Sequence, residues 1–215
     1  MSPAFVATYV IAAYFVGSIP FGWLTARTLG GIDIRQHGSG NIGATNVGRV
    51  MGLKYFFLVF LLDMLKGFLP TLGISSNVGK IPFESLTPLA AHGPILVAAA
   101  AIVGHNFPVY LKFKGGKGVA TSLGAVLALD PPSAGFALFV FVVIVGLTRW
   151  VSAASLAATT AFLMSHFAST EEPFGRFEWG TSSLMIGLWA MMIWRHRANL
   201  KRIVNGTEPK VGRKK

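Results

Sequence analysis

The chain has 215 residues, of which 53% are hydrophobic and only 13% are charged, and its formal net charge is +11. A soluble domain carries about 25% charged residues, so this composition excludes an ordinary soluble protein and predicts an all-α integral membrane protein. The chain contains no cysteine, which excludes disulfides, thiolate nucleophiles and cysteine-based zinc or iron–sulfur sites.

Apolar stretches separated by polar, proline or glycine breaks predict seven transmembrane helices. In chain order they lie at about residues 4–26, 52–74, 86–107, 119–130, 133–148, 152–168 and 180–195. The stretch at 119–130 would rise only about 18 Å as a helix, short of the roughly 30 Å hydrocarbon core, so it is either a tilted span or a re-entrant arm. Residues 1–20 contain no Lys or Arg, so the first helix is expected to be retained and not cleaved as a signal peptide. We expect one membrane domain, residues 1–208, followed by a basic tail, residues 209–215.

The basic residues predict which side of the membrane each loop faces. The basic loops hold Arg27, Arg35, Arg49 and Lys54, then Lys112, Lys114 and Lys117, then Arg149, and finally Arg195 at the start of the tail. The alternate loops hold Lys80 and Arg176 together with Glu84, Asp130, Glu171, Glu172 and Glu178. By the positive-inside rule, the N-terminus is expected outside and the C-terminus in the cytoplasm. Every basic, glycine-rich segment then faces the cytoplasm.

Residues 38–49 form the first glycine-rich segment, Gly-Ser-Gly-Asn-Ile-Gly-Ala-Thr-Asn-Val-Gly-Arg. Its glycines allow backbone N–H groups to turn toward one point, and polar side chains add donors around that point, which predicts an anion-binding loop. The segment also matches a dinucleotide-binding pattern at Gly38, Gly40 and Gly43. That match is rejected because a helix is predicted before it, where the pattern needs a strand. The alternative interpretation is a flexible connector.

Residues 104–121 form the second glycine-rich segment. A helix is expected to end near Pro108 and another to begin near Val119, so the glycines between them precede a helix N-terminus, which favours phosphate binding. Lys117 adds a full positive charge. The segment is not a Walker A loop, because Gly118 stands where a serine or threonine should hold magnesium. The alternative is that its lysines only contact lipid head groups.

Two further polar clusters lie at predicted cytoplasmic helix ends. One is residues 149–152 with Ser155 a turn further on. Taken singly, Arg149 is better explained as a topology residue than as a ligand. The other is residues 195–202, where His196, Asn199 and Arg202 recur on one face of a continuing helix. Taken singly, this second cluster is also explained as a stop-transfer sequence.

Two ionisable residues lie inside the second predicted span. Asp63 and Lys66 are spaced i, i+3, so they share one face of that helix. Charged groups at such depth are costly and are usually paired or functional. The sequence leaves open whether this pair only neutralises itself or serves the site.

Taken together, three motifs in order resemble the bacterial acyl-phosphate:glycerol-3-phosphate acyltransferase family. The motifs are GSGNIGATN at residues 38–46, GHNFP at 104–108 with KGGKG at 114–118, and HRAN at 196–199. The resemblance runs from about residue 18 to residue 208. It implies a multi-pass enzyme of the bacterial inner (plasma) membrane with its active site facing the cytoplasm. The implied reaction moves a fatty acyl group from acyl phosphate to the 1-hydroxyl of glycerol 3-phosphate, giving lysophosphatidic acid in the first step of phospholipid synthesis.

The resemblance also implies which residues form the site. Catalytic roles are expected for Ser39, Arg49, Lys117, His196 and Asn199. Substrate binding is expected for Gly38, Gly40, Asn41, Gly43, Thr45, Asn46, His105, Lys112, Gly115, Gly116, Gly118, Arg149 and Ser152. No cofactor, metal or nucleic-acid partner is expected. The expected partners are acyl phosphate, glycerol 3-phosphate and the lipid bilayer, with the upstream acyl-phosphate-forming enzyme as a candidate.

The residue inventory favours direct acyl transfer. No serine nucleophile with a base and an orienting acid is evident, and the predicted cytoplasmic carboxylates are Asp33 and Glu208, too few for a dedicated metal site. We hypothesise that a phosphate oxygen of the substrate accepts the proton of the acceptor hydroxyl, and that His105 and His196 mainly orient substrate.

Two other classes of function remain as alternatives. A transporter for a phosphorylated solute would place Asp63 and Lys66 on its pathway, and it predicts inverted repeats, which are not visible in the sequence. A membrane anchor that recruits partners through its basic tail predicts that deletion of residues 209–215 destroys function.

Overall fold

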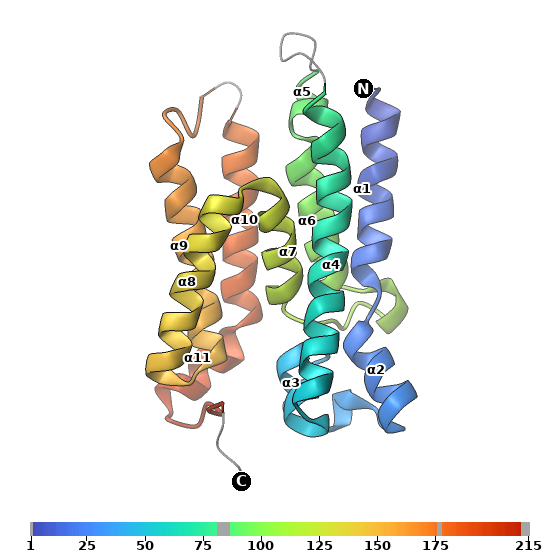
Figure 1. Cartoon of the computed structure of the whole chain (residues 1–215), viewed down its shortest axis with the longest axis vertical. Coiled ribbons are helices and arrows are strands. Elements are labelled where there is room, and N and C mark those ends of the chain that lie inside the picture. Colours follow the sequence, from blue (N-terminus) through green and yellow to red (C-terminus); the bar gives the residue numbers. More distant parts are fainter. Residues whose placement is uncertain (1, 81–86, 176–177, 212–215) are drawn as a thin grey trace. The chain divides into compact units, whose positions relative to one another are not determined.

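Apolar helices dominate this chain because a segment in lipid must satisfy its backbone hydrogen bonds internally. The computed structural model describes residues 2–80, 87–175 and 178–211, and within these ranges the regular structure is entirely helical, as predicted. The chain divides into two compact units, Met1–Leu129 and Asp130–Lys215 (Figure 1). The prediction of one membrane domain with a separate tail stays a prediction.

The first unit carries both glycine-rich segments. Its elements are α1 (Pro3–Ser18), α2 (Phe21–Gly30), η1 (Ile34–Gln36), α3 (Ala44–Met51), α4 (Leu53–Val78), α5 (Pro88–Ala91), α6 (Gly93–Asn106), η3 (Val109–Leu111) and α7 (Val119–Leu129). In Figure 1, α2, α3 and the first turn of α4 lie at one end of this unit, and the chain between α6 and α7 turns toward the same end. The start of α1 lies at the opposite end.

The first predicted helix is broken into two. The sequence predicts one helix over residues 4–26, but α1 ends at Ser18 and α2 begins at Phe21. Pro20 has no N–H to donate and its ring disfavours helical backbone at Ile19, which adopts φ −59° and ψ 116°. The prediction of a continuous helix was therefore wrong, and the chain turns at an elbow, Ile19–Pro20.

The second half of the first glycine-rich segment is helical. The sequence treats residues 38–49 as a loop, whereas α3 starts at Ala44 with Gly43 as its N-cap and continues to Met51. Thr45, Asn46 and Arg49 are therefore helical residues. α3 ends at Gly52, whose φ of 106° is accessible to glycine and lets α4 start at once.

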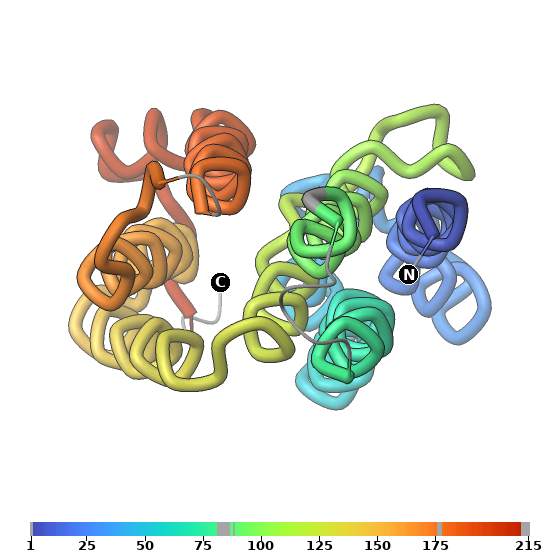
Figure 2. Tube along the Cα trace, turned by 90° about the horizontal axis from the view of Figure 1, so that it is seen from above, coloured from blue at the N-terminus to red at the C-terminus, as the bar shows by residue number. Residues whose placement is uncertain are grey.

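Glycines allow the helices of the first unit to pack at backbone contact. A Cβ added to Gly17 of α1 would lie 2.2 Å from the Ala101 carbonyl oxygen of α6, and one added to Gly124 of α7 would lie 2.0 Å from the Met64 carbonyl oxygen of α4. Small residues are common where transmembrane helices pack, because the hydrophobic effect does not drive association in lipid. Figure 2 shows α1, α4, α6 and α7 grouped in the first unit.

The second unit carries the other two polar clusters. Its elements are α8 (Pro131–Thr148), α9 (Val151–Ser169), α10 (Trp179–Arg195) and α11 (Arg197–Val204). α8 ends at Arg149, which adopts a left-handed conformation with φ 60°. The chain does not continue as one helix through residues 195–202, because α10 ends at Arg195 and α11 begins after His196. The expectation of a continuing helix there was wrong.

Within residues 2–80, 87–175 and 178–211, five helical stretches are long and apolar enough to cross a membrane. They are Pro3–Gly30, Leu53–Val78, Gly93–Leu111, Pro131–Thr148 and Val151–Ser169. The other two predicted spans correspond to α7, with 11 residues, and α10, with 17 residues. An all-helical membrane architecture is thus supported, while the count of seven and the sidedness stay predictions. The start of the predicted span 86–107, Glu84, Arg176 and the last basic residues from 213 onward lie outside the described residues.

Candidate functional site

The first glycine-rich segment is organised by the side chain of Asn46. Its Oδ1 accepts a hydrogen bond from the Ser39 N–H at 2.8 Å, and its Nδ2 donates to the carbonyl oxygens of His37 at 3.0 Å and Asn41 at 2.8 Å. Asn41 in turn accepts from the Gly43 N–H at 2.8 Å. Asn46 is only 2% exposed. Its amide therefore shapes the loop from within, although the sequence grouped it with the substrate-binding side chains.

Two glycines make this loop possible. Gly38 and Gly40 have φ values of 60° and 70°, which are strained for other residues. A Cβ on Gly38 would lie 2.3 Å from the Asn46 Oδ1 that holds the loop. Ser39 and Arg49, the two predicted catalytic residues of the segment, are exposed, and Thr45 is half-buried. Ser39 of the loop and Arg49 of α3 thus expose a hydroxyl and a guanidinium on the N-terminal side of α4.

A carboxylate close to this loop is neutralised locally. Asp33 accepts hydrogen bonds from the Arg35 guanidinium, including one from Nε at 2.9 Å. That hydrogen bond holds the pKa of Asp33 well below its usual range. Asp33 also accepts from the Arg35 N–H at 3.1 Å as the cap of η1. Its negative charge is therefore held by Arg35 beside the region predicted to bind anions.

The second glycine-rich segment folds back onto His105. The Gly116 N–H donates to the His105 carbonyl at 3.1 Å. A Cβ on Gly116 would lie 2.0 Å from His105 Nε2, and one on Gly115 would lie 2.2 Å from the His105 carbonyl oxygen. Gly118, with φ 82°, turns the chain into α7, which starts at Val119 as predicted. Glycines are required here by contact with a buried histidine.

The lysines of this segment occupy different environments. Lys112 and Lys114 are exposed, whereas Lys117 is half-buried beside Gly116 and Gly118. Lys112 and Phe113 are consecutive non-glycine residues with positive φ, 51° and 62°. Positive φ is uncommon for non-glycine residues, and Lys112 adopts it as the C-cap of η3. Lys117 is the lysine whose place in the loop best fits the predicted phosphate contact.

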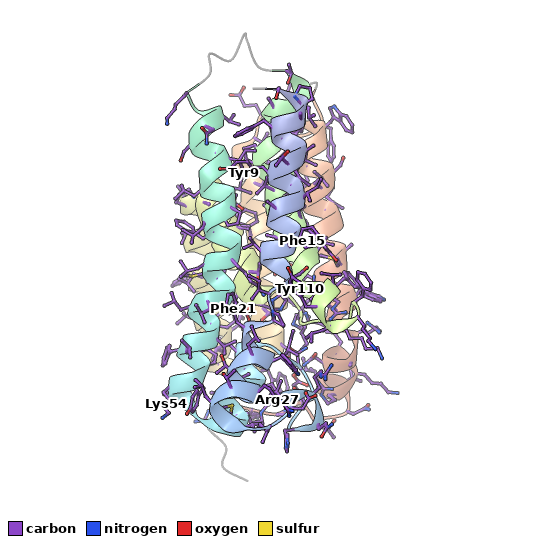
Figure 3. All side chains as sticks on the ribbon, turned by 90° about the vertical axis from the view of Figure 1, so that its right-hand side faces the viewer. Tyr9, Phe15, Phe21, Arg27, Lys54 and Tyr110 are labelled. Carbon is purple, nitrogen blue, oxygen red and sulfur yellow. The ribbon has the colours of Figure 1, made fainter. Side chains whose placement is uncertain are left out.

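The two glycine-rich segments share one hydrophobic core. Leu111, next to Lys112, is buried in a cluster with Ile34, Ile42 and Val47 of the first segment and its flanks. Gly22 of α2 adds to this contact, since a Cβ there would lie 1.8 Å from the Ile42 carbonyl oxygen. Two segments about 60 residues apart in sequence are therefore anchored to the same core. Figure 3 shows Arg27 and Lys54 at this end of the first unit and Tyr9 further along it.

In the second unit, hydrogen bonds to Glu208 join the polar cluster at residues 149–155 to the one at residues 195–202. The sequence did not assign Glu208 to the site. Glu208 accepts hydrogen bonds from Ser152 Oγ and Asn199 Nδ2 at 2.6 Å each, and from Arg202 Nε at 2.7 Å. Burial opposes its charge, but these three donors together lower the pKa of Glu208. Two predicted site residues are thus held by one carboxylate. The available signal was a lone acidic residue directly before the basic tail.

His196 is fixed at the junction of α10 and α11. It is 1% exposed, and its Nδ1 lies 2.9 Å from the Met192 carbonyl oxygen. Because a carbonyl only accepts, Nδ1 of His196 donates this hydrogen bond. Arg149 is exposed, and its carbonyl accepts from the Val211 N–H at 3.0 Å, which ties the tail to the end of α8.

The structure therefore collects the predicted site residues into two groups. The first unit brings Ser39, Arg49 and the loop glycines to the same end as His105 and Lys117. The second unit brings Ser152 and Asn199 together on Glu208. In the same unit, the His196 carbonyl accepts from the Asn199 N–H, and Arg149 lies at the end of α8. Among the described residues, no group of three or more His, Asp or Glu side chains is arranged to hold a metal ion. The expectation of a metal-independent reaction stays a prediction.

Comparison with known proteins places this geometry in a family. Residues 7–206 match the family model for glycerol-3-phosphate acyltransferase. The chain is 40% identical to the glycerol-3-phosphate acyltransferase of Bacillus velezensis over 206 residues, covering 96% of this chain and 97% of that protein. It is 43% identical to that of Aquifex aeolicus over 200 residues, covering 93% and 95%.

Two solved structures are similar over nearly the whole chain. One is a crystal structure of PlsY, an integral membrane glycerol 3-phosphate acyltransferase, in its glycerol 3-phosphate form, with TM-score 0.83, 39% identity and 96% of each chain covered. The other is its lysophosphatidic acid form, with TM-score 0.80, 39% identity and coverage of 96% of this chain and 95% of that chain.

Proposed function

The chain belongs to the glycerol-3-phosphate acyltransferase family, and from this we propose that it transfers a fatty acyl group from acyl phosphate to the 1-hydroxyl of glycerol 3-phosphate. The products are lysophosphatidic acid and inorganic phosphate. The observation that carries this proposal is the similarity, over 96% of the chain, to a membrane enzyme solved in glycerol 3-phosphate and lysophosphatidic acid forms. Acyl phosphate as the donor is what the resemblance of the three motifs implies, and two anion-binding segments are consistent with two phosphate-bearing substrates.

The first unit supplies the groups that bind phosphate in this proposal. The segments around Gly38–Gly43 and Gly115–Gly118 form two anion-binding loops, in which Arg49 and Lys117 supply the positive charge. The N–H groups of Ser39, Gly43 and Gly116 hold these loops in shape. Asn46 and His105 act through the loops that they hold in shape. Asn41, Thr45 and Lys112 complete the lining of these loops. The shared core at Leu111 supports a fixed spacing between the two phosphates.

The remaining predicted residues lie in the second unit. We propose Arg149 as a further cation for a substrate phosphate and His196 as a residue that orients the acceptor. Glu208 fixes the rotamers of Ser152 and Asn199 through its hydrogen bonds. A carboxylate that holds two such side chains keeps them in place for substrate.

The proposed reaction is direct. The 1-hydroxyl oxygen attacks the acyl carbon, the bond from that carbon to the phosphate oxygen breaks, and the hydroxyl proton passes to the leaving phosphate. Acyl phosphate is a mixed anhydride, so its leaving group needs little acid assistance. Binding both substrates by their phosphates supplies proximity, and side-chain donors of the loops, such as the exposed Ser39 hydroxyl, stabilise the oxyanion by about 3 kcal/mol per well-placed donor.

The role of His196 is tested by its pH–rate profile. If substrate phosphate accepts the proton, His196→Asn lowers the rate but leaves the shape of the profile unchanged. Rates of acyl transfer are measured from pH 5 to 9 with saturating substrates, and glycerol 3-phosphate binding is measured in parallel. Loss of a limb near about pH 6–7 with unchanged binding would instead assign the proton to His196.

The function itself is tested with purified protein and defined donors. Radiolabelled glycerol 3-phosphate is offered with acyl phosphate, acyl-CoA or acyl carrier protein, with and without a metal chelator. Lysophosphatidic acid is expected from acyl phosphate alone, with the chelator present. Uptake of glycerol 3-phosphate into vesicles without acylation would support the transporter alternative and contradict the enzyme.

We also propose seven spans with the N-terminus outside and the site facing the cytoplasm of a bacterial inner membrane. The grouping of basic segments at one end of the first unit supports this sidedness (Figure 1). Because the chain has no cysteine, a single introduced cysteine is the only thiol that a reagent can label, and its labelling reports the side of the membrane on which it lies. A Gln36→Cys variant is expected to react with a membrane-impermeant thiol reagent only in inverted vesicles, and Ser76→Cys only in intact cells. The reverse pattern would refute the orientation.

A further inference from the structure

Two charged residues are buried in the middle of the first unit. Asp63 Oδ1 and Lys66 Nζ of α4 form an ion pair of 2.8 Å, and each side chain is 2% exposed. α4 packs against α1, α3, α6 and α7, so the pair lies where several elements meet. Mutual neutralisation explains why an aspartate and a lysine can both be buried at this place. It does not explain why each side chain also contacts a different neighbouring element.

Lys66 reaches the elbow between α1 and α2. Its Nζ donates to the carbonyl oxygen of Ile19 at 2.7 Å and lies 5.6 Å from the centre of the Phe21 ring. Ile19 is the C-cap of α1 and directly precedes Pro20. Lys66 therefore fixes the direction in which α2 leaves the elbow. α2 then meets the first glycine-rich segment at Gly22, against the Ile42 carbonyl oxygen.

Asp63 reaches the second segment. Its Oδ1 lies 3.6 Å from Nδ1 of His105, whose side chain is 4% exposed. The other ring nitrogen lies against Gly116, whose added Cβ would lie 2.0 Å from His105 Nε2. The orientation of the His105 ring therefore sets the position of the Gly115–Gly118 loop.

Stability alone is a weak reason for this ion pair. Burying two charges costs desolvation free energy that their attraction often fails to exceed, and an apolar pair of similar volume is frequently as stable. A pair that links the elbow to His105 has another use, because the relative position of two binding loops matters for a two-substrate reaction. A misplacement of about 1 Å at a reacting centre can lower a rate by about 100-fold.

We propose that Asp63 and Lys66 are positioning residues that hold the two glycine-rich segments at the spacing required for acyl transfer, Lys66 through Ile19 and α2, and Asp63 through His105 and Gly116. The proposal rests on the proposed function of these segments. It predicts that loss of the pair leaves each phosphate loop able to bind but misaligns the two bound substrates.

The test separates alignment from folding and from binding. The double variant Asp63→Leu with Lys66→Met replaces the pair by apolar side chains, Lys66→Arg retains a charged donor for Ile19, and Leu69→Ala changes an exposed residue of the same helix as a control. Each purified protein is measured for thermal unfolding in detergent, glycerol 3-phosphate affinity by calorimetry, and kcat with saturating acyl phosphate.

The proposal expects the double variant to unfold within about 5 °C of the parent, to bind glycerol 3-phosphate within about 3-fold, and to lose about 30- to 100-fold in kcat. Lys66→Arg should regain part of that loss, and Leu69→Ala should match the parent. A folded double variant with kcat within about 3-fold of the parent would overturn the proposal, and so would failure of both pair variants to fold, which would assign the pair to folding. An inactive parent protein would overturn the proposed function instead.

Discussion

Lys117→Ala is expected to lower kcat/KM for acyl transfer by about 100- to 1,000-fold while leaving folded protein in the membrane. Lys117 is the half-buried lysine beside Gly116 and Gly118, where a charge-assisted hydrogen bond to a phosphate is strong because water is partly excluded. Activity is measured on purified protein normalised to the folded fraction from size-exclusion chromatography.

Lys114→Ala is the matched control for that change. Lys114 lies in the same segment but is exposed, so its removal alters the local charge equally without touching the loop. It should cost less than about 3-fold in rate, because exposed charges are screened. Retention of most activity by Lys117→Ala, or equal losses in the two variants, would contradict the assignment of Lys117 to phosphate.

Gly116→Ala is expected to reduce activity by about 100-fold although it adds one methyl group. That methyl carbon would lie 2.0 Å from His105 Nε2, and the ring is buried next to Asp63. The loop must therefore move, and it takes Lys117 and the Gly118 N–H with it. The change is measured as kcat with both substrates saturating, together with the yield of folded protein.

Gly135→Ala provides the comparison for Gly116→Ala. Gly135 lies in α8. A Cβ added to it would have no heavy atom within 4 Å apart from its chain neighbours and the backbone of its own helix. Alanine should be tolerated there and even favoured in a helix. An active Gly116→Ala protein would mean that the loop has room to adjust and that its glycines are not required by contact with His105.

The long helices were predictable because lipid leaves few alternatives for an apolar backbone. The predicted stretches 133–148 and 152–168 correspond to α8 at Pro131–Thr148 and α9 at Val151–Ser169. Proline and charged residues mark their ends directly in the sequence. The same composition argument supports the membrane class, although it does not by itself establish how many helices cross.

Short elements were not predictable because tertiary contacts decide them. α3 contains Gly48 and follows a glycine-rich loop, so its intrinsic helix propensity is low. It forms where Val47 is buried with Ile34 and Leu111, contacts that the linear sequence does not display. The elbow at Pro20 was visible as a proline, but its importance depends on Lys66, 47 positions from Ile19.

The sequence motifs identified most of the site residues, but they did not show how those residues interact. Asn46 has a polar side chain in the right segment, yet its amide is directed at the backbone of its own loop. Glu208 was considered only as a scarce cytoplasmic carboxylate, because its partners Ser152 and Asn199 lie 56 and 9 positions away. Composition identifies residue types, whereas only folding shows which of them hold others in place.

The attachment of the tail to the second unit determines where this protein can be shortened or fused to another. Glu208 joins α9 to α11, and the Val211 N–H is bonded to the carbonyl of Arg149 beyond it. A reporter or affinity tag that begins before residue 208 would leave Ser152, Asn199 and Arg202 without their shared acceptor. The permissible junction therefore lies after Val211, three residues past the boundary that composition alone suggests.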